Sequence, residues 1–151
     1  MRSGTLAIEG VESLLDRWKR KFRHGSFTYT DSATSFRQQV ADHFGNAIGK
    51  VYGVYLIRRR HDRTILYIGK GGTIGGDGQF KGQDIPGRLQ NVRGGDIGAD
   101  RWFRQLLLEA GPVAVEYVVL ALPVAPAYIE VSLLQAYLAE YGRLPPKNSA
   151  L

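Results

Sequence analysis

Apolar side chains recur along this chain at two spacings, one typical of helices and one typical of strands. Residues 6–22 carry an apolar stripe at helical spacing and end in a basic cluster, which predicts a first helix because cations complement the carboxyl end of a helix dipole. A second helix is predicted to begin at Asp31 or Ser32, either of which can cap it, and to end at Gly45. The N-terminal third is therefore expected to be helical.

The pattern changes after the second predicted helix. Two runs rich in β-branched and aromatic residues, 51–57 and 64–68, flank a polar segment and predict a hairpin. Residues 113–122 are apolar at nearly every position, which is typical of a central strand. Further helices are predicted at three segments, 88–92, 99–110 and 126–141. Together these elements predict one α+β domain.

The segment from Gly69 to Gly87 contains eight glycines, counting the two at its ends. Such a segment has too little side chain to form a core element, so it is predicted to be a long surface loop. Loops of this length are either functional or disordered, and the pattern alone leaves both open.

The composition limits which metal ligands and which kinds of partner are expected. The chain of 151 residues has no cysteine, and its three histidines, His24, His43 and His61, are far apart, so any metal is expected on oxygen ligands. The net charge of +6 favours a polyanionic partner, with nucleic acid ahead of an anionic membrane surface. No long apolar run and no leader-like start is seen, so no membrane association and a cytoplasmic location are expected.

One carboxylate stands out in the last predicted helix. Glu130 shares a helix face with Leu134, Tyr137 and Tyr141, where an apolar residue is expected. A buried carboxylate needs a cation, a proton or a metal. The alternative is that Glu130, in the first turn, only complements the helix dipole.

The predicted hairpin pairs each of two tyrosines with a glycine two positions away, as Gly53-Val54-Tyr55 and Tyr67-Ile68-Gly69. Glycine inside a strand marks a close approach of backbone or ligand. With an odd-length connection Tyr55 would lie opposite Tyr67 and both phenols would share one face; with an even one they would point apart. An ordinary aromatic cross-strand pair is the alternative.

These two motifs resemble those of the GIY-YIG nucleases. Lys70 follows the second motif, Arg88 precedes a leucine at the start of the next predicted helix, Glu130 lies in the late helix, and Asn148 follows prolines near the end. The order of these residues is the order in that family, and the resemblance covers about residues 50–148.

The resemblance implies a small three-stranded antiparallel sheet flanked by helices, formed by residues 49–151, with residues 1–48 as an N-terminal helical extension packed on it. It also implies one divalent cation, Mg²⁺ with Mn²⁺ as a substitute, held mainly by Glu130 and water. In the family an arginine steadies the phosphate and a tyrosine takes a proton from the attacking water, and positioned cations lower the barrier to hydrolysis. The implied catalytic residues are Tyr55, Tyr67, Lys70, Arg88, Glu130 and Asn148, and the implied DNA contacts are Lys70, Lys81, Arg88 and Arg93.

The sequence departs from the family at two places. The family often has a histidine or tyrosine one turn after the arginine, where this chain has Val92, and the glycine-rich insertion is long, as in restriction-type members. The expected function is a DNA endonuclease. A binding module without cleavage and a nuclease acting on RNA are the alternatives, and an enzyme that cuts palindromes would be expected to form a homodimer.

Overall fold

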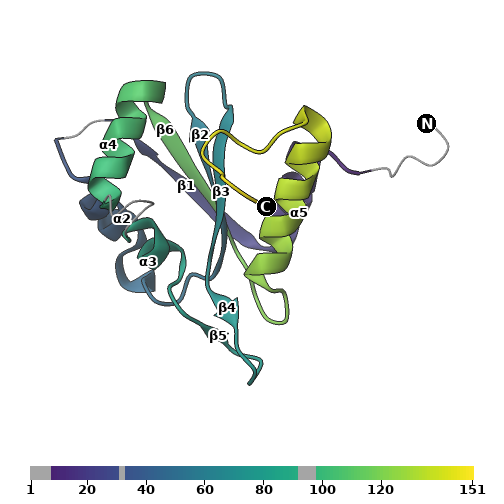
Figure 1. Ribbon diagram of the computed structural model, residues 1–151. Coiled ribbons are helices and arrows are strands. Elements are labelled where there is room, and N and C mark those ends of the chain that lie inside the picture. Colours follow the sequence, from purple (N-terminus) through teal and green to yellow (C-terminus); the bar gives the residue numbers. More distant parts are fainter. Residues whose placement is uncertain (1–7, 31–32, 92–97) are drawn as a thin grey trace.

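The computed structural model describes residues 8–30, 33–91 and 98–151 of the protein. A four-stranded sheet lies between two layers of helices, with α2, α3 and α4 on one face and α1 and α5 on the other (Figure 1). In chain order the elements are α1 (Val11–Lys21), β1 (Arg23–Tyr29), α2 (Phe36–Phe44), the 3-10 helix η1 (Gly45–Ala47), β2 (Gly53–Arg59), β3 (Ile65–Gly71), β4 (Thr73–Ile74), β5 (Phe80–Lys81), α3 (Ile85–Leu89), α4 (Ala99–Ala110), β6 (Val113–Val119) and α5 (Pro126–Tyr141).

The strand order of the main sheet is β1-β6-β2-β3, and its pairings are antiparallel. The α+β class predicted from the sequence is confirmed. The predicted central position of the strand at 113–122 is also confirmed, because β6 has a hydrogen-bonded neighbour on each side. Strands β1 and β3 form the two edges.

The expected three-stranded sheet is wrong in detail, because β1 adds a fourth strand from the part of the chain that was predicted to be helical. In β1 the residues with strong strand preference are confined to its end, Phe27 to Tyr29, and the strand begins with the basic pair Arg23 and His24. The alternation of inward Phe27 and Tyr29 with exposed neighbours is the pattern of an edge strand with one buried face. Segment 1–48 therefore contributes to the sheet as well as packing on it.

The first two predicted helices begin later in the chain than their apolar spacing suggested. Helix α1 begins at Val11, and α2 begins at Phe36 with Ser35 as its cap, whose hydroxyl accepts a hydrogen bond from the amide of Gln38. Asp31 and Ser32, the predicted caps of this helix, lie outside the described residues. Helices α4 and α5 span their predicted ranges.

The two faces of the sheet bury separate apolar clusters because successive strand residues point to opposite sides. Val54, Leu56 and Ile68 pack against α1 and α5. Tyr55 and Ile57 pack toward α2, α3 and α4. The two tyrosine motifs thus place their phenols in the layer that contains α3.

A buried ion network joins α1 to the sheet on the first of these faces. Arg58 Nε donates to Glu116 at 2.9 Å, and its terminal nitrogens donate to the carboxylate of Glu12 at 2.7 Å. Arg63 also donates to Glu116, and Lys19 lies 3.6 Å from it. The side chains of Arg58 and Glu116 are 3% and 8% exposed, so each charge depends on these partners.

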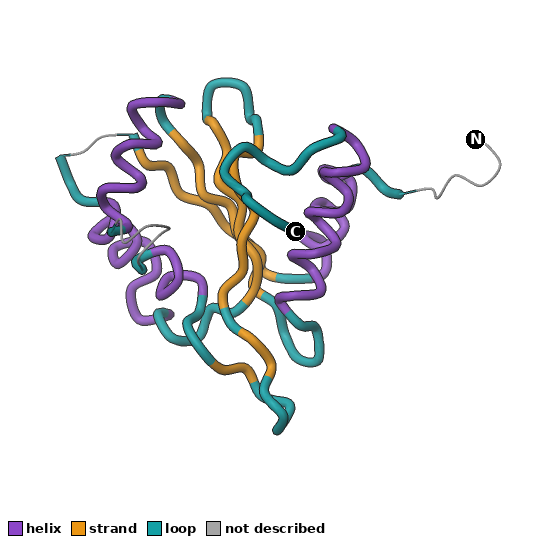
Figure 2. Tube along the Cα trace, viewed as in Figure 1, coloured by secondary structure: helices purple, strands orange, loops and turns teal. Residues whose placement is uncertain are grey.

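The glycine-rich segment was predicted to be a surface loop, and part of it forms the two-stranded hairpin β4–β5, which projects from one end of the main sheet (Figure 2). Tyr52 stacks on Phe80 with ring centroids 4.8 Å apart and anchors the hairpin to the body. Gly72, at φ 95°, has no room for a side chain because the ring of Tyr52 covers it. Within the described ranges, no helix is long and apolar enough to cross a bilayer.

Candidate active site

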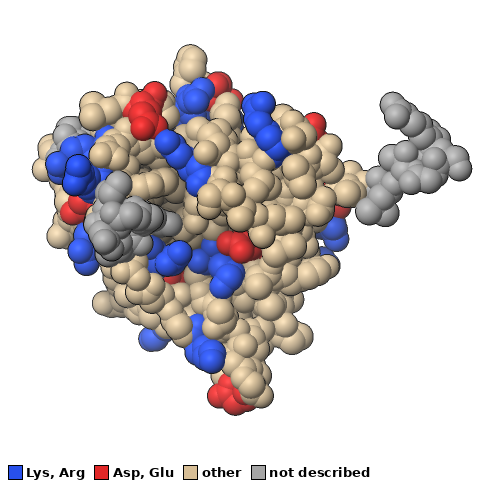
Figure 3. All heavy atoms as spheres, in the orientation of Figure 1, with Lys and Arg blue, Asp and Glu red and all other residues tan. Residues whose placement is uncertain are grey.

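A cleft of about 250 Å³ lies at the end of β3, where the hairpin β4–β5 leaves the sheet. Four of the predicted catalytic side chains line it, and they come from three elements: Tyr67 and Lys70 from β3, Arg88 from α3 and Glu130 from α5. The face of the molecule in Figure 3 shows, near its centre, one acidic side chain among several basic ones. Residues separated by up to 63 positions in the sequence thus meet around one space of phosphate size.

The two tyrosines share a face of the sheet, but they are not directly opposite each other as an odd-length connection was expected to place them. Tyr55 pairs with Gly69, and Tyr67 pairs with Ile57, so the phenols are offset diagonally by two residues. Their ring centroids are 5.9 Å apart. The register shifts between Ile57 and Arg58, which leaves Leu66 of β3 as an extra residue without a paired partner, and the sequence pattern did not reveal this irregularity.

Gly69 makes room for both rings. A Cβ atom at this position would come within 2.6 Å of the Tyr67 ring and within 2.8 Å of the Tyr55 hydroxyl. Tyr55 is fully buried, whereas Tyr67 is half-buried and lines the cleft. Of the two phenols, Tyr67 is therefore the one exposed in the cleft.

Arg88 is held in place by the cap of the short helix that carries it. Asp84 Oδ1 accepts a hydrogen bond from the amide of Gly87 at 3.1 Å, and its Oδ2 accepts from the amides of Gly49 and Val51 at 2.5 and 3.1 Å. Asp84 is 3% exposed, so one carboxylate ties the start of α3 to the segment before β2. Arg88 lies one turn later and reaches the cleft.

Asp84 is a positioning residue that the sequence analysis missed, because α3 begins at Ile85 and not near Arg88. An aspartate two residues before a proline is the usual sign of a helix start and could have revealed it. Gly71 also contributes, since a Cβ there would clash with the backbone of Asp84 and Ile85. The glycine lets α3 begin directly against β3.

Glu130 and Lys70 approach the cleft from the α5 side of the sheet. Lys70 Nζ donates a weak hydrogen bond to the carbonyl of Gly72 at 3.4 Å. Burial raises the pKa of the Glu130 carboxyl, and the charges of Lys70 and then Arg88 act in the opposite direction. Leu134 and Tyr137, on the same helix face, are buried as predicted, so Glu130 is a half-buried carboxylate on an otherwise apolar stripe.

The other predicted residues have different positions. Lys81 lines the cleft from β5 and is exposed. Asn148 does not line it: its side chain accepts from the amide of Ile68 and donates to the carbonyl of Ile68, each at 2.9 Å. Arg93 and Val92 lie outside the described residues.

The donor set suits a magnesium ion that takes most of its ligands from outside the protein. Glu130 is the one carboxylate that lines the cleft in the described part of the chain, and no cluster of three or more acidic or histidine side chains occurs there. Magnesium prefers oxygen, keeps several waters, and is often held by one or two carboxylates together with substrate phosphates. The cleft meets that minimum with one carboxylate.

Comparison with known proteins gave no match. No protein-family model, no curated protein and no solved structure matches the chain.

The chemistry available in the cleft follows from its charges. Lys70 and Arg88 place two cations beside a half-buried carboxylate, and Lys81 adds a third at the rim. A guanidinium can bind two phosphate oxygens at once. A phosphate group entering the cleft would therefore meet both cations and a carboxylate suited to a metal.

Proposed function

We propose that the protein is a divalent-metal-dependent endonuclease that hydrolyses phosphodiester bonds in DNA. The observation that carries the proposal is the meeting of Tyr67, Lys70, Arg88 and Glu130 in one cleft. These are four of the residues through which the sequence resembles the GIY-YIG nucleases, and they come from three elements, β3, α3 and α5. A role of Glu130 in complementing the helix dipole alone gives no reason for two cations to line the same open cleft.

We assign a separate role to each of these residues from its position in the cleft. Arg88 and Lys70 bind the scissile phosphate and stabilise the negative charge that develops on its oxygens. Glu130 would hold Mg²⁺ or Mn²⁺, which supplies Lewis-acid stabilisation of the phosphate when bound. Tyr67 contacts the attacking water or the phosphate, because it is the phenol that lines the cleft.

The remaining predicted residues act through others. Tyr55 is fully buried, and its ring packs beside the ring of Tyr67 with the centroids 5.9 Å apart. Asn148 fixes the backbone of β3 through Ile68, directly between Tyr67 and Gly69. We therefore assign both as positioning residues and not as groups that touch substrate.

The basic balance of the chain and the projecting hairpin favour DNA as the substrate. Lys81 and Gln83 lie where β5 and the following loop border the cleft. A two-stranded ribbon with polar side chains can enter a DNA groove, where glutamine and lysine read base edges. The hairpin is therefore the proposed part of the protein that contacts DNA beside the cut.

The test is nicking of supercoiled plasmid with Mg²⁺ or Mn²⁺, compared with a reaction in which the metal is chelated. Glu130→Gln and Arg88→Ala are each expected to lower the rate about 100-fold or more. Arg104→Ala, an exposed cation on α4, is the matched control and should cut like the wild type. Absence of nicking by the wild type, or equal nicking by Glu130→Gln, would refute the proposal.

Cleavage of RNA substrates and binding of DNA, measured in parallel, distinguish the two alternatives: a nuclease acting on RNA and a binding module without cleavage. Preferential cleavage of RNA over DNA would make the protein a ribonuclease. Salt-sensitive binding of DNA without cleavage at any metal concentration would make it a binding module.

A further inference from the structure

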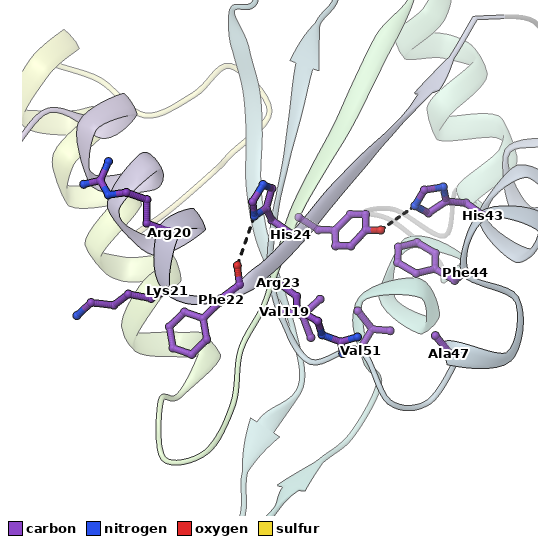
Figure 4. Close-up of a pocket in the computed structure, with 11 residues that line it drawn as sticks. Arg20, Lys21, Phe22, Arg23, His24, His43, Phe44, Ala47, Val51 and Val119 are labelled. Carbon is purple, nitrogen blue, oxygen red and sulfur yellow. Dashed lines mark hydrogen bonds between the residues drawn. The ribbon is translucent and has the colours of Figure 1, made fainter.

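A second and larger cleft, of about 600 Å³, lies at the opposite edge of the sheet from the candidate active site. It lies between the end of α1 and the α2–η1 segment, over the first residues of β1 (Figure 4). Strands β1 and β3 are the two edges of the sheet, so three inter-strand spacings, about 14 Å, separate them. The proposed function makes no use of this cleft.

The cleft is lined by cations without carboxylate neighbours. Lys21 and Arg23 line it together with Arg20, and none of its lining residues is an aspartate or a glutamate. Arg17 and Lys19, from the same helix, pair with Glu9 and Glu116. By contrast, Lys21 and Arg23 form no ion pair with any described residue. Lys21 Nζ lies 5.6 Å from the centroid of the Trp18 ring, and no described carboxylate neutralises its charge or that of Arg23.

A fixed pair of polar rings forms part of the opposite wall. The Tyr117 hydroxyl and His43 Nε2 are 2.7 Å apart. Burial raises the pKa of the Tyr117 phenol and lowers the pKa of the His43 imidazole. Tyr117 lies over Gly25, where a Cβ would be 2.5 Å from the phenol oxygen. The glycine in β1 is thus required for the shape of the cleft.

We propose that this cleft is a second binding site for the phosphate backbone of DNA. The inference rests on the proposed function only in taking DNA as the polyanion. Lys21 and Arg23 supply charge for phosphates, and His24 and His43 supply ring nitrogens that can contact phosphate oxygens. Because the two clefts open at opposite edges, a DNA held at both passes around the end of the sheet or presents two separate segments.

The experiment measures binding without cleavage, using Glu130→Gln protein without divalent metal and a fluorescent duplex of about 40 base pairs, roughly four helical turns. Adding Lys21→Ala and Arg23→Ala together should lower the slope of log affinity against log salt by about 2. The affinity itself should fall at least about 10-fold at 0.1 M salt. Adding Arg60→Ala and Arg143→Ala instead removes the same charge from exposed residues near the β2–β3 turn and should change neither quantity by a comparable amount.

Equal losses in the two double variants would overturn the proposal, because general charge and not this cleft would then explain binding. A second measurement follows the His24 and His43 ring signals by NMR. Shifts as large with inorganic phosphate as with DNA, at equal phosphate concentration, would also overturn it in favour of a site for free phosphate. Binding through this cleft by wild-type protein that never nicks plasmid would refute the proposed function and support the cleft, so the two failures are distinguishable.

Discussion

Tyr55 and Gly69 face each other on neighbouring strands, and the missing side chain at position 69 is what lets the two tyrosine rings lie side by side. Tyr67 contacts the same glycine from its own strand and closes the cleft wall. The glycine of the second motif is therefore a packing requirement of the site, independent of any turn or unusual backbone angle.

Gly69→Ala should damage the site by pushing both rings apart. Overpacking of this kind costs about 1 to 3 kcal/mol of stability, and displacement of Tyr67 should lower nicking at least about 10-fold. Urea unfolding and plasmid nicking measure the two effects. Gly76→Ala is the matched control, because a Cβ at position 76 meets nothing within 4 Å and both quantities should stay near wild type.

The two phenols should differ in their importance for catalysis. Tyr67→Phe removes the hydroxyl that lines the cleft and should lower the nicking rate about 100-fold. Tyr55→Phe changes a fully buried ring, so it should cost about 1 kcal/mol of stability with a much smaller effect on rate. Equal rate losses for both variants, with the fold intact by circular dichroism, would contradict this division of roles.

Asp84→Ala should affect stability and rate together because the carboxylate accepts hydrogen bonds from one amide at the start of α3 and from two amides in the segment before β2. We expect a loss of about 2 to 4 kcal/mol and a fall in kcat on the order of 10-fold or more, as Arg88 loses its support. Ser35→Ala removes the cap of α2, which carries no residue of the candidate active site, and should cost about 1 kcal/mol with kcat unchanged. A loss of kcat in both variants would mean that reduced stability alone explains the effect.

Glu130→Gln should abolish nicking without destabilising the protein at neutral pH. Burial raises the pKa of this carboxyl above its unfolded value, so its ionised form opposes folding as the pH rises through that range. The variant should therefore have a Tm equal to or above that of the wild type at pH 7, and the difference should vanish below about pH 4, where both side chains are neutral. A clearly lower Tm at pH 7 would show that Glu130 stabilises the fold.

Glu116 should show the opposite dependence on pH. Burial acts to raise its pKa, but hydrogen bonds from Arg58 and Arg63 and the charge of Lys19 prevail and lower it. Its contribution is present above the unfolded pKa and is lost as the pH falls through the lowered one. Glu116→Gln should cost about 2 to 4 kcal/mol at pH 7 and progressively less in acid. Glu109→Gln, whose partner Lys147 is exposed, should cost under about 1 kcal/mol.

Regular apolar spacing predicted the elements that are buried along most of their length. Helices α4 and α5 span the predicted residues, and β6 was recognised as a central strand because nearly every position in it is apolar. Strand β1 was missed because a strand with one buried face and a basic start resembles the end of the helix before it. The start of α3 was missed because its cap and proline lie within a segment whose glycines suggested a loop.

Short motifs were enough to choose the residues of the candidate site, but they did not show how deeply each side chain is buried. Spacing left open whether Tyr55 and Tyr67 share a face, because that depended on the length of the connection, and the observed register makes them diagonal neighbours on one face. Tyr55 is fully buried, and the Asn148 side chain is hydrogen-bonded to the backbone of β3. Both properties follow from three-dimensional packing. Neither a motif nor a period contains that information.

The hydrogen bonds between the C-terminal segment and β3 have a further consequence. Strand β3 is an edge of the sheet, yet the carbonyl of Leu66 accepts from the amide of Lys147, and Asn148 occupies both backbone groups of Ile68. These are the groups through which a stray strand from another molecule would add to the sheet. Because its own C-terminal segment occupies these groups, the chain protects the sheet edge beside the candidate active site against strand addition by another molecule.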